Sequence, residues 1–207
     1  MNSSEIPQIL DSMIAAATAA GKEVLRIYLD DNFEVEIKSD NSPLTIADKE
    51  AHRIICQKLK SDFPTLPILS EESENLTFEK RKYWKSFFLV DPLDGTKEFI
   101  SRNGEFTINI ALIHGTEAIA GVVYVPVNRK LYYGDTRSSN SFLEFEGEKK
   151  RLVTRNLSRD LPIEIVASRR HGQKNFETFL KEAEELFPSA NVINMGSSIK
   201  LCLLAEG

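Results

Sequence analysis

Two short apolar segments of this chain run directly into acidic residues, and this arrangement limits the sheets that the chain can build. Residues 66–69 lead into Ser70-Glu71-Glu72-Ser73-Glu74, and residues 87–90 lead into Asp91-Pro92-Leu93-Asp94-Gly95-Thr96. Apolar runs of this length, bounded by turn-forming residues, are typical of buried strands. If the two strands are neighbours in one sheet, their acidic ends meet in one pocket.

Clustered carboxylates in such a pocket favour a site for hard divalent cations. The carboxylates expected there are Asp48, from the start of a predicted helix, Glu71, Glu72, Asp91 and Asp94. Four or five carboxylates cannot share a pocket unless cations neutralise their charge. Because these ligands offer only oxygen, they select magnesium or manganese over zinc or copper. We expect Asp91 to bridge two ions, with the carbonyl of Leu93 as a neutral ligand.

The turn after the second strand adds a place for an anion. Gly95 lets the backbone approach a ligand closely, and the amides of Gly95 and Thr96 open the next helical turn. Two cations roughly 3.5–4 Å apart can hold a phosphate oxygen, lower the pKa of a bound water and stabilise the leaving oxygen. We expect the hydroxyl of Thr96, linked to Asp48 or Glu71, to orient that water.

Each of these parts also has a simpler explanation. Asp-Pro-x-Asp-Gly is an ordinary turn sequence, and residues 71–74 can form the acidic first turn of a helix. Asp48 is also explained as the N3 residue of a capping box that begins at Thr45. Two consecutive apolar strands that both end in carboxylates, the second followed by Gly-Thr, are hard to obtain from surface solvation alone. We therefore favour the metal site.

Composition excludes several other classes of function. The chain has 207 residues, a hydrophobic fraction of 42% and a net charge of −5, which suits one large or two small globular domains. A negative chain has no general attraction for nucleic-acid phosphates, so no nucleic-acid partner is expected. Because no run reaches membrane-spanning length and no signal-peptide pattern is found, we expect a cytoplasmic protein without a transmembrane segment. Peripheral attachment to the inner membrane is an open alternative.

The apolar periodicity predicts an α+β chain whose later part alternates strands and helices. The predicted elements are helices at 6–28, 46–62, 174–187 and 197–205, and strands at 33–37, 66–69, 87–90, 106–113, 117–124, 130–134, 141–145, 162–167 and 190–194. A polar segment at 151–161 is the best boundary between domains. We predict a metal-binding domain over 1–155 and a partial α/β substrate domain over 156–207, while no exposed stripe argues for a monomer or a dimer.

The motifs resemble the magnesium-dependent, lithium-sensitive phosphatase superfamily of inositol monophosphatase, whose signature is an Asp, then Glu-Glu, then DP(I/L)DGT. Here these residues are Asp48, Glu71-Glu72 and 91–96. Within the superfamily, the resemblance is greatest to the CysQ branch of 3'(2'),5'-bisphosphate nucleotidases. The segments that carry it are 41–48, 95–99, 102–107 and 196–200. The similarity runs along nearly the whole chain.

The resemblance implies a fold, a reaction and a set of ligands. The fold is a layered αβαβα sandwich, and the reaction removes the 3'-phosphate from 3'-phosphoadenosine 5'-phosphate to leave AMP, in sulfur assimilation. Two or three magnesium ions, or manganese in their place, are implied. The implied ligands are Glu71, Asp91 and the Leu93 carbonyl for the first ion and Asp91 with Asp94 for the second. Thr96, with Asp48 or Glu71, is then the catalytic group that positions the attacking water.

The second phosphate of the small-molecule substrate needs a site of its own. In relatives that prefer bisphosphorylated nucleotides, basic and hydroxyl groups of the second domain meet it, and segments 168–171 and 196–200 match them. Ser197 and Ser198 are expected to open a helix whose N-terminus attracts anions, with Lys200 one turn in. The implied substrate-binding residues are Gly95, Thr96, Ser168, His171, Ser197 and Lys200. The alternatives are an N-capped helix with a solvated lysine and a solvated Arg-Arg-His turn.

The chain departs from the family pattern at its end. Family members continue past the position of Gly207 into a Trp-Asp-x-Ala-x-Gly segment, whose Asp is a ligand of the second magnesium. We therefore expect an incomplete second domain and weak binding of the second ion, so that phosphatase activity is reduced or absent. Two other functions stay open: an inositol monophosphatase-type phosphatase with the same metals, and a truncated, inactive homologue that binds the nucleotide without turnover.

Overall fold

Two long helices open the chain in the computed structural model, which describes residues 3–30, 35–37, 43–73, 76–168 and 173–207. Helix α1 (Ile6–Leu29) follows a 3-10 turn, η1 (Ser3–Glu5), and carries a proline in its first turn, where a missing amide hydrogen costs nothing. Helix α2 (Ile46–Asp62) begins with the predicted capping box. Both helices are confirmed. Among the described residues, no helix combines the length and the apolarity that crossing a membrane requires.

In the described part of the chain, seven strands form one sheet in the order β3-β4-β5-β6-β7-β8-β9. β3 (Ile68–Ser70) and β4 (Ser86–Asp94) are parallel, and the later neighbours pair antiparallel. The later strands are β5 (Thr107–His114), β6 (Glu117–Val125), β7 (Lys130–Asp135), β8 (Asn140–Phe145) and β9 (Glu148–Arg151). The predicted meander is confirmed. β9 was not predicted because all its side chains are exposed and give no apolar alternation.

The acidic corner is built differently from the turn that the sequence suggested. β4 does not end at Val90: its pairing with β5 continues at Asp91 and Asp94, with an irregularity between them. A bulge of this kind accommodates Pro92, which has no amide hydrogen for the ladder. The short helix α4 (Thr96–Ile100) follows directly. Residues 71–73 form a turn, so the alternative of an acidic first helical turn at this place is wrong.

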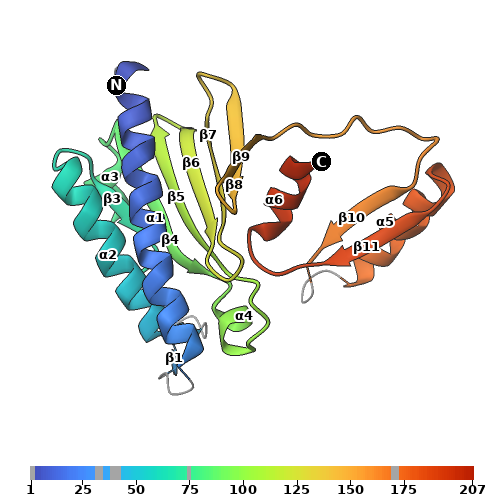
Figure 1. Cartoon of the computed structure of the whole chain (residues 1–207), viewed down its shortest axis with the longest axis horizontal. Helices are drawn as coiled ribbons and strands as arrows, with labels where there is room; N and C mark the ends of the chain where they lie inside the picture. The colour runs from blue at the N-terminus through green and yellow to red at the C-terminus, as the bar shows by residue number, and fades with distance from the viewer. Residues whose placement is uncertain (1–2, 31–34, 38–42, 74–75, 169–172) are drawn as a thin grey trace.

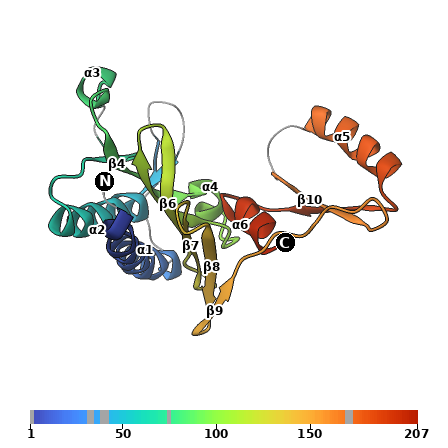
Figure 2. The ribbon, with the colours of Figure 1, turned by 90° about the horizontal axis from the view of Figure 1, so that it is seen from above.

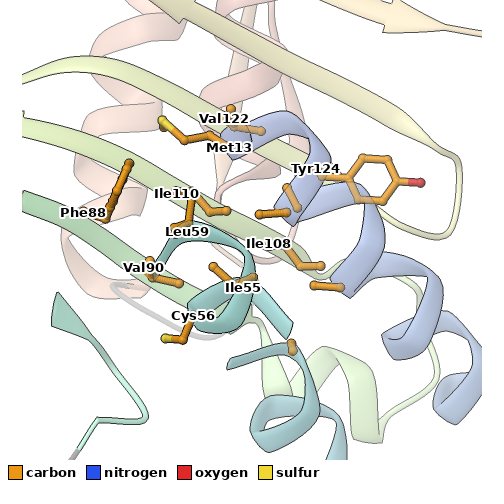
Figure 3. Packing of buried hydrophobic residues seen from close by; sticks show 14 of the residues in the cluster. Met13, Ile55, Cys56, Leu59, Phe88, Val90, Ile108, Ile110, Val122 and Tyr124 are labelled. Atoms are coloured by element: carbon orange, nitrogen blue, oxygen red, sulfur yellow. The ribbon is translucent and has the colours of Figure 1, made fainter. Parts of the chain in front are cut away.

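The core lies between the two long helices and one face of the sheet (Figure 1). Figure 3 shows Met13 of α1 and Leu59 of α2 among strand side chains such as Phe88 and Val122, all of them buried. A Cβ atom at Gly21 of α1 would lie 2.3 Å from the Tyr124 ring, so α1 approaches β6 closely. Burial of these apolar faces is the main force that holds the helices on the sheet.

The later part of the chain adds three more layers. Its elements are β10 (Ile163–Ala167), α5 (Gln173–Leu186), β11 (Ala190–Asn194) and α6 (Ile199–Glu206). β10 and β11 pair in parallel. Figures 1 and 2 both show the succession of α1 and α2, the large sheet, α6, the β10–β11 pair and α5. This succession confirms the layered αβαβα fold, whereas the domain division at 155/156 stays a prediction.

Smaller elements complete the description of the fold. β1 (Val35–Ile37) pairs with β2 (Pro43–Thr45), which leads into α2, and α3 (Phe78–Arg81) lies between β3 and β4. Helix α6 is fixed to the large sheet by Glu206, whose Oε1 accepts hydrogen bonds from the Tyr132 hydroxyl at 2.5 Å and from Lys130 Nζ at 3.0 Å. These two hydrogen bonds attach α6 to the large sheet, and α6 also lies beside the β10–β11 pair.

Candidate active site

The acidic ends of β3 and β4 lie side by side, as the sequence predicted. The register pairs Ser70 with Val90, and the amide of Glu71 donates to the carbonyl of Val90 at 3.0 Å. Because the two strands are parallel, the residues that follow them meet at the same edge of the sheet. Glu71 and Asp91 therefore share one corner.

Asp91 lies in an environment that disfavours its charge. Burial raises the pKa of Asp91 most, and the negative charges of Glu71 and Asp94 raise it further, to about 7. A hydrogen bond with the Glu71 side chain acts in the same direction, whereas the amide of Leu93, 3.2 Å from Oδ1, lowers the pKa. A cation bound beside Asp91 would favour its charged form and so lower this pKa.

Asp94 connects this corner to the segment before α6. Its Oδ2 accepts a hydrogen bond from the backbone amide of Ser198 at 2.6 Å and from the Thr107 hydroxyl at 3.5 Å. The Ser198 hydroxyl lies 2.7 Å from the Thr107 hydroxyl and donates to Oδ1 of Asn109 at 2.9 Å. Sequence reasoning gave no role to Thr107 or Asn109. Only their alternation on β5, two residues apart and therefore on one face, could have suggested them.

Asp48 meets Thr96 across the fold. The Thr96 hydroxyl donates to Oδ1 of Asp48 at 3.1 Å and lies 3.3 Å from the Leu93 carbonyl oxygen. Oδ2 of Asp48 accepts from the Thr45 amide at 2.7 Å and the Thr45 hydroxyl at 2.6 Å. Burial raises the pKa of Asp48, and the hydrogen bonds from Thr45 and Thr96 oppose that shift. Of the two partners expected for Thr96, Asp48 is the one that the structure places within hydrogen-bonding distance.

Gly95 separates β4 from α4 and needs to be a glycine. Its φ is +96°, and a Cβ atom there would lie 3.0 Å from the Glu105 carbonyl oxygen and 3.2 Å from Cβ of Ser197. A side chain would therefore be strained and crowded. The close approach brings the start of α4 against the segment before α6, although an anion site at the Gly95 and Thr96 amides stays a prediction.

The donors of the corner fit magnesium by their chemistry. The carboxylates of Glu71, Asp91 and Asp94 and the carbonyl of Leu93 are hard oxygen ligands. Within the described ranges, however, no three His, Cys, Asp or Glu side chains are arranged as a ready metal site. Glu71 and Asp91 share a hydrogen bond, and Asp94 accepts the Ser198 amide. The ligand roles stay predictions.

The residues predicted for a second phosphate lie on two segments. Ser168 follows β10 and is half-buried. Lys200, in the first turn of α6, donates from Nζ to the carbonyl oxygens of Ser197 at 2.6 Å and Met195 at 3.3 Å. His171 lies outside the described residues, as do its two arginine neighbours in the predicted basic turn. The substrate roles of these residues stay predictions.

Two histidines outside this corner contact serine side chains. Nδ1 of His52 lies 2.8 Å from the Ser70 hydroxyl, and Nδ1 of His114 lies 2.7 Å from the Ser86 hydroxyl. Cys56 and Cys202 are buried free thiols. Burial raises the pKa of both, that of Cys202 to about 12. Buried thiols of high pKa are inert.

The layered fold and the acidic edge together define a class of metal-dependent phosphatases. The inositol monophosphatase family model matches residues 7–207, and the chain belongs to this family. The 3'(2'),5'-bisphosphate nucleotidase CysQ of Escherichia coli strain K12 is 40% identical over 200 residues, which cover 96% of this chain and 77% of the relative. The protein of the same name from Buchnera aphidicola is 38% identical over 97% of this chain and 72% of its own length.

Solved structures support the same assignment. CysQ from Bacteroides thetaiotaomicron, described as a bacterial member of the inositol monophosphatase family, superposes with a TM-score of 0.79 at 38% identity. The match covers 96% of this chain and 76% of that structure. The extragenic suppressor protein suhB from Bartonella henselae has a TM-score of 0.75 at 27% identity, over 97% of this chain and 75% of that structure. The family and the fold expected from the motifs are confirmed.

Proposed function

We propose that this protein is a magnesium-dependent 3'(2'),5'-bisphosphate nucleotidase that hydrolyses 3'-phosphoadenosine 5'-phosphate to AMP and phosphate. The observation that carries the proposal is the 40% identity, across 96% of the chain, to proteins of that name. The acidic corner agrees with it, because hydrolysis of a phosphate ester needs a place where cations and an anion meet. A cytoplasmic location agrees with a small-molecule substrate and also stays a proposal.

The corner supplies the ligands in this mechanism. Glu71, Asp91 and the Leu93 carbonyl would hold one cation, and Asp91 with Asp94 a second. When bound, the cations lower the pKa of a water and neutralise the oxygens of the transferring phosphoryl group. Because burial and the neighbouring negative charges raise the pKa of Asp91, binding of a cation at this carboxylate would be coupled to proton release.

Thr96 and Asp48 would position the attacking water. Because Oδ1 of Asp48 accepts the hydroxyl proton of Thr96, the oxygen of Thr96 is left to accept a hydrogen bond from the water. The buried Asp48 is itself oriented by two hydrogen bonds from Thr45, so the pair has little freedom to turn away. Water loses a proton as it adds to phosphorus, the bond to the 3'-oxygen breaks, and that oxygen takes up a proton, so that AMP and phosphate are formed.

The remote phosphate of the substrate would be held by the segment before α6. Ser197 lies there, and Lys200 in the first turn of α6 brings a positive charge that the backbone carbonyls of the segment already orient. Ser168 and His171 would add a hydroxyl and an imidazole from the segment after β10. A charged group that is already oriented binds phosphate at a lower entropic cost than a free surface lysine.

Phosphate release tests the function directly. We expect magnesium-dependent release from 3'-phosphoadenosine 5'-phosphate, with a kcat/KM well above that for an inositol monophosphate. Lys200→Ala should lower kcat/KM for the bisphosphate by about 10-fold or more and leave the inositol monophosphate almost unaffected, because one charge-assisted contact is lost. Lys181→Ala on the exposed face of α5 is the matched control. Equal use of both substrates by the unaltered protein would favour the inositol monophosphatase-type alternative instead.

A further inference from the structure

The segment that joins β11 to α6, residues 195–198, is held by two carboxylates, one at the end of β4 and one just before β5. Glu105 accepts the backbone amide of Gly196 at Oε2, 2.7 Å away, and Asp94 accepts the amide of Ser198 at 2.6 Å. Both hydrogen bonds are short and have a carboxylate acceptor, which makes them about twice as strong as neutral ones. Figures 1 and 2 both show this segment beside α4.

Gly196 fits this place because it has no side chain. A Cβ atom at Gly196 would lie 2.6 Å from Cγ of Glu98 and 3.1 Å from both the carbonyl oxygen and Oε2 of Glu105. Glu98 is itself buried on α4. The backbone of the segment is therefore pressed against α4 and residue 105, and its amide points directly at the Glu105 carboxylate.

Glu105 is in turn held in place by its own neighbours. Its amide donates to Oδ1 of Asn103 at 2.9 Å, and the next residue, Phe106, is fully buried in the core. Two residues further on, the Thr107 hydroxyl lies 2.7 Å from the Ser198 hydroxyl. Residues 105–107, which lead into β5, thus contact the segment at both ends.

The backbone connects Glu105 to the residues proposed to bind the substrate. Residue 196 lies between Met195 and Ser197, whose carbonyl oxygens both accept hydrogen bonds from Lys200 Nζ. Ser197 has a φ of +47°, a conformation that a non-glycine residue keeps only when its surroundings fix it. Releasing the Gly196 amide would free both carbonyls, and with them the ammonium of Lys200.

We propose that Glu105 is a positioning residue that sets the preference for a bisphosphorylated substrate, an inference that rests on the proposed function. By holding the Gly196 amide, Glu105 keeps Ser197 and Lys200 aligned for the remote phosphate. Glu105 is not one of the proposed metal ligands, so we expect its effect to fall mainly on the second phosphate. A carboxylate near an anion site is unfavourable by charge alone, and this role explains why one is found there.

The test compares two substrates that differ by one phosphate. Steady-state kinetics of Glu105→Ala, Glu105→Gln and the exposed control Glu177→Ala are measured on 3'-phosphoadenosine 5'-phosphate and on adenosine 3'-monophosphate. For Glu105→Ala we expect kcat/KM to fall by about 10-fold to 100-fold on the bisphosphate and by less than about 3-fold on the monophosphate. Glu105→Gln should restore most of the loss, since its amide oxygen can accept from Gly196.

A second measurement needs no turnover. Amide hydrogen exchange of a peptide spanning residues 195–201 should be faster in Glu105→Ala than in the unaltered protein, and unchanged in Glu177→Ala. Unchanged exchange in Glu105→Ala, or equal losses of kcat/KM on both substrates, would overturn the inference. If the unaltered protein hydrolyses neither nucleotide, the proposed function fails, and the exchange result alone then decides whether Glu105 holds the segment.

Discussion

The hydroxyl oxygen of Thr96 lies 3.1 Å from Oδ1 of Asp48, a residue 48 positions earlier in the chain. The same Asp48 side chain closes the capping box of α2 through its other oxygen. One carboxylate therefore stabilises a helix start and aligns a candidate catalytic hydroxyl.

This double role predicts a variant pair that separates stability from catalysis. Asp48→Ala should lower the free energy of unfolding by about 1–2 kcal/mol through loss of the cap. It should also lower kcat by about 100-fold or more through loss of the partner of Thr96. Thr45→Ala also weakens the cap but leaves the acceptor of Thr96 in place, so its kcat should fall by less than about 10-fold. Urea unfolding and phosphate release measure the two effects, and equal losses of kcat in both variants would contradict the assignment of Asp48.

Asp91 should lower the stability of the metal-free protein. Its pKa is raised to about 7 in the folded state by burial and by the charges of Glu71 and Asp94. A carboxyl with a raised pKa stabilises the fold while protonated, and that stability is lost as pH rises through about 7. Asp91→Asn should therefore raise Tm without metal by about 3–8 °C at about pH 8, and by less at about pH 5.

The same variant should lose its response to magnesium. Addition of MgCl₂ raises Tm of a protein that binds the ion only when folded. We expect this rise for the unaltered protein and for the exposed control Asp160→Asn, but not for Asp91→Asn. Differential scanning fluorimetry in the presence of EDTA or of magnesium measures this change in Tm. If Tm of Asp91→Asn rose with magnesium as much as that of the unaltered protein, Asp91 would not be a ligand.

His52 should contribute a pH dependence of stability that is separate from the acidic corner. Burial, and then the positive charge of Lys60, lower the pKa of His52. A histidine with a lowered folded pKa stabilises the fold above its unfolded pKa, and that contribution is lost as pH falls through the folded pKa. The free energy of unfolding should thus fall less steeply between about pH 7 and pH 5 in His52→Asn than in the unaltered protein. Urea unfolding of both proteins at several pH values tests this. If His52 were not involved, the free energy of unfolding would change with pH by the same amount in both.

Glu206 should carry the attachment of α6 to the large sheet. Its Oε1 accepts from the Tyr132 hydroxyl, and Tyr132 is buried. Glu206→Ala leaves that hydroxyl without its acceptor, at a cost of about 1–3 kcal/mol. Tyr132→Phe removes the orphaned group, so the double variant should lose less than the sum of the single variants. A double-mutant cycle by urea unfolding, with the exposed Glu185→Ala as control, tests this, and additive losses would count against it.

The elements that bury an apolar face could be predicted from the sequence, and those held by backbone contacts could not. α1 and α2 show helical periodicity, and the parallel neighbours β3 and β4 could be inferred because both end in acids. The full length of β4 was missed because Pro92 favours a turn, whereas a bulge between Asp91 and Asp94 allows the strand to continue.

The candidate site divides in the same way. The acidic residues and Thr96 are distinctive in type and spacing, so the motif found them. The hydrogen bonds from the amides of Gly196 and Ser198 involve donors that every non-proline residue has, and no residue type marks them in advance. Thr107 and Asn109 were missed for a related reason, since their importance depends on which segment packs against β5.

The shortness of β3 has a consequence for the free protein. At the edge of the sheet it pairs with β4 over three residue positions, of which Ser70 is the last. A strand with so few pairs opens by local fluctuation far more often than the core strands do, and Glu71 moves with it. A cation shared by Glu71 and Asp91 would fasten that strand to its neighbour.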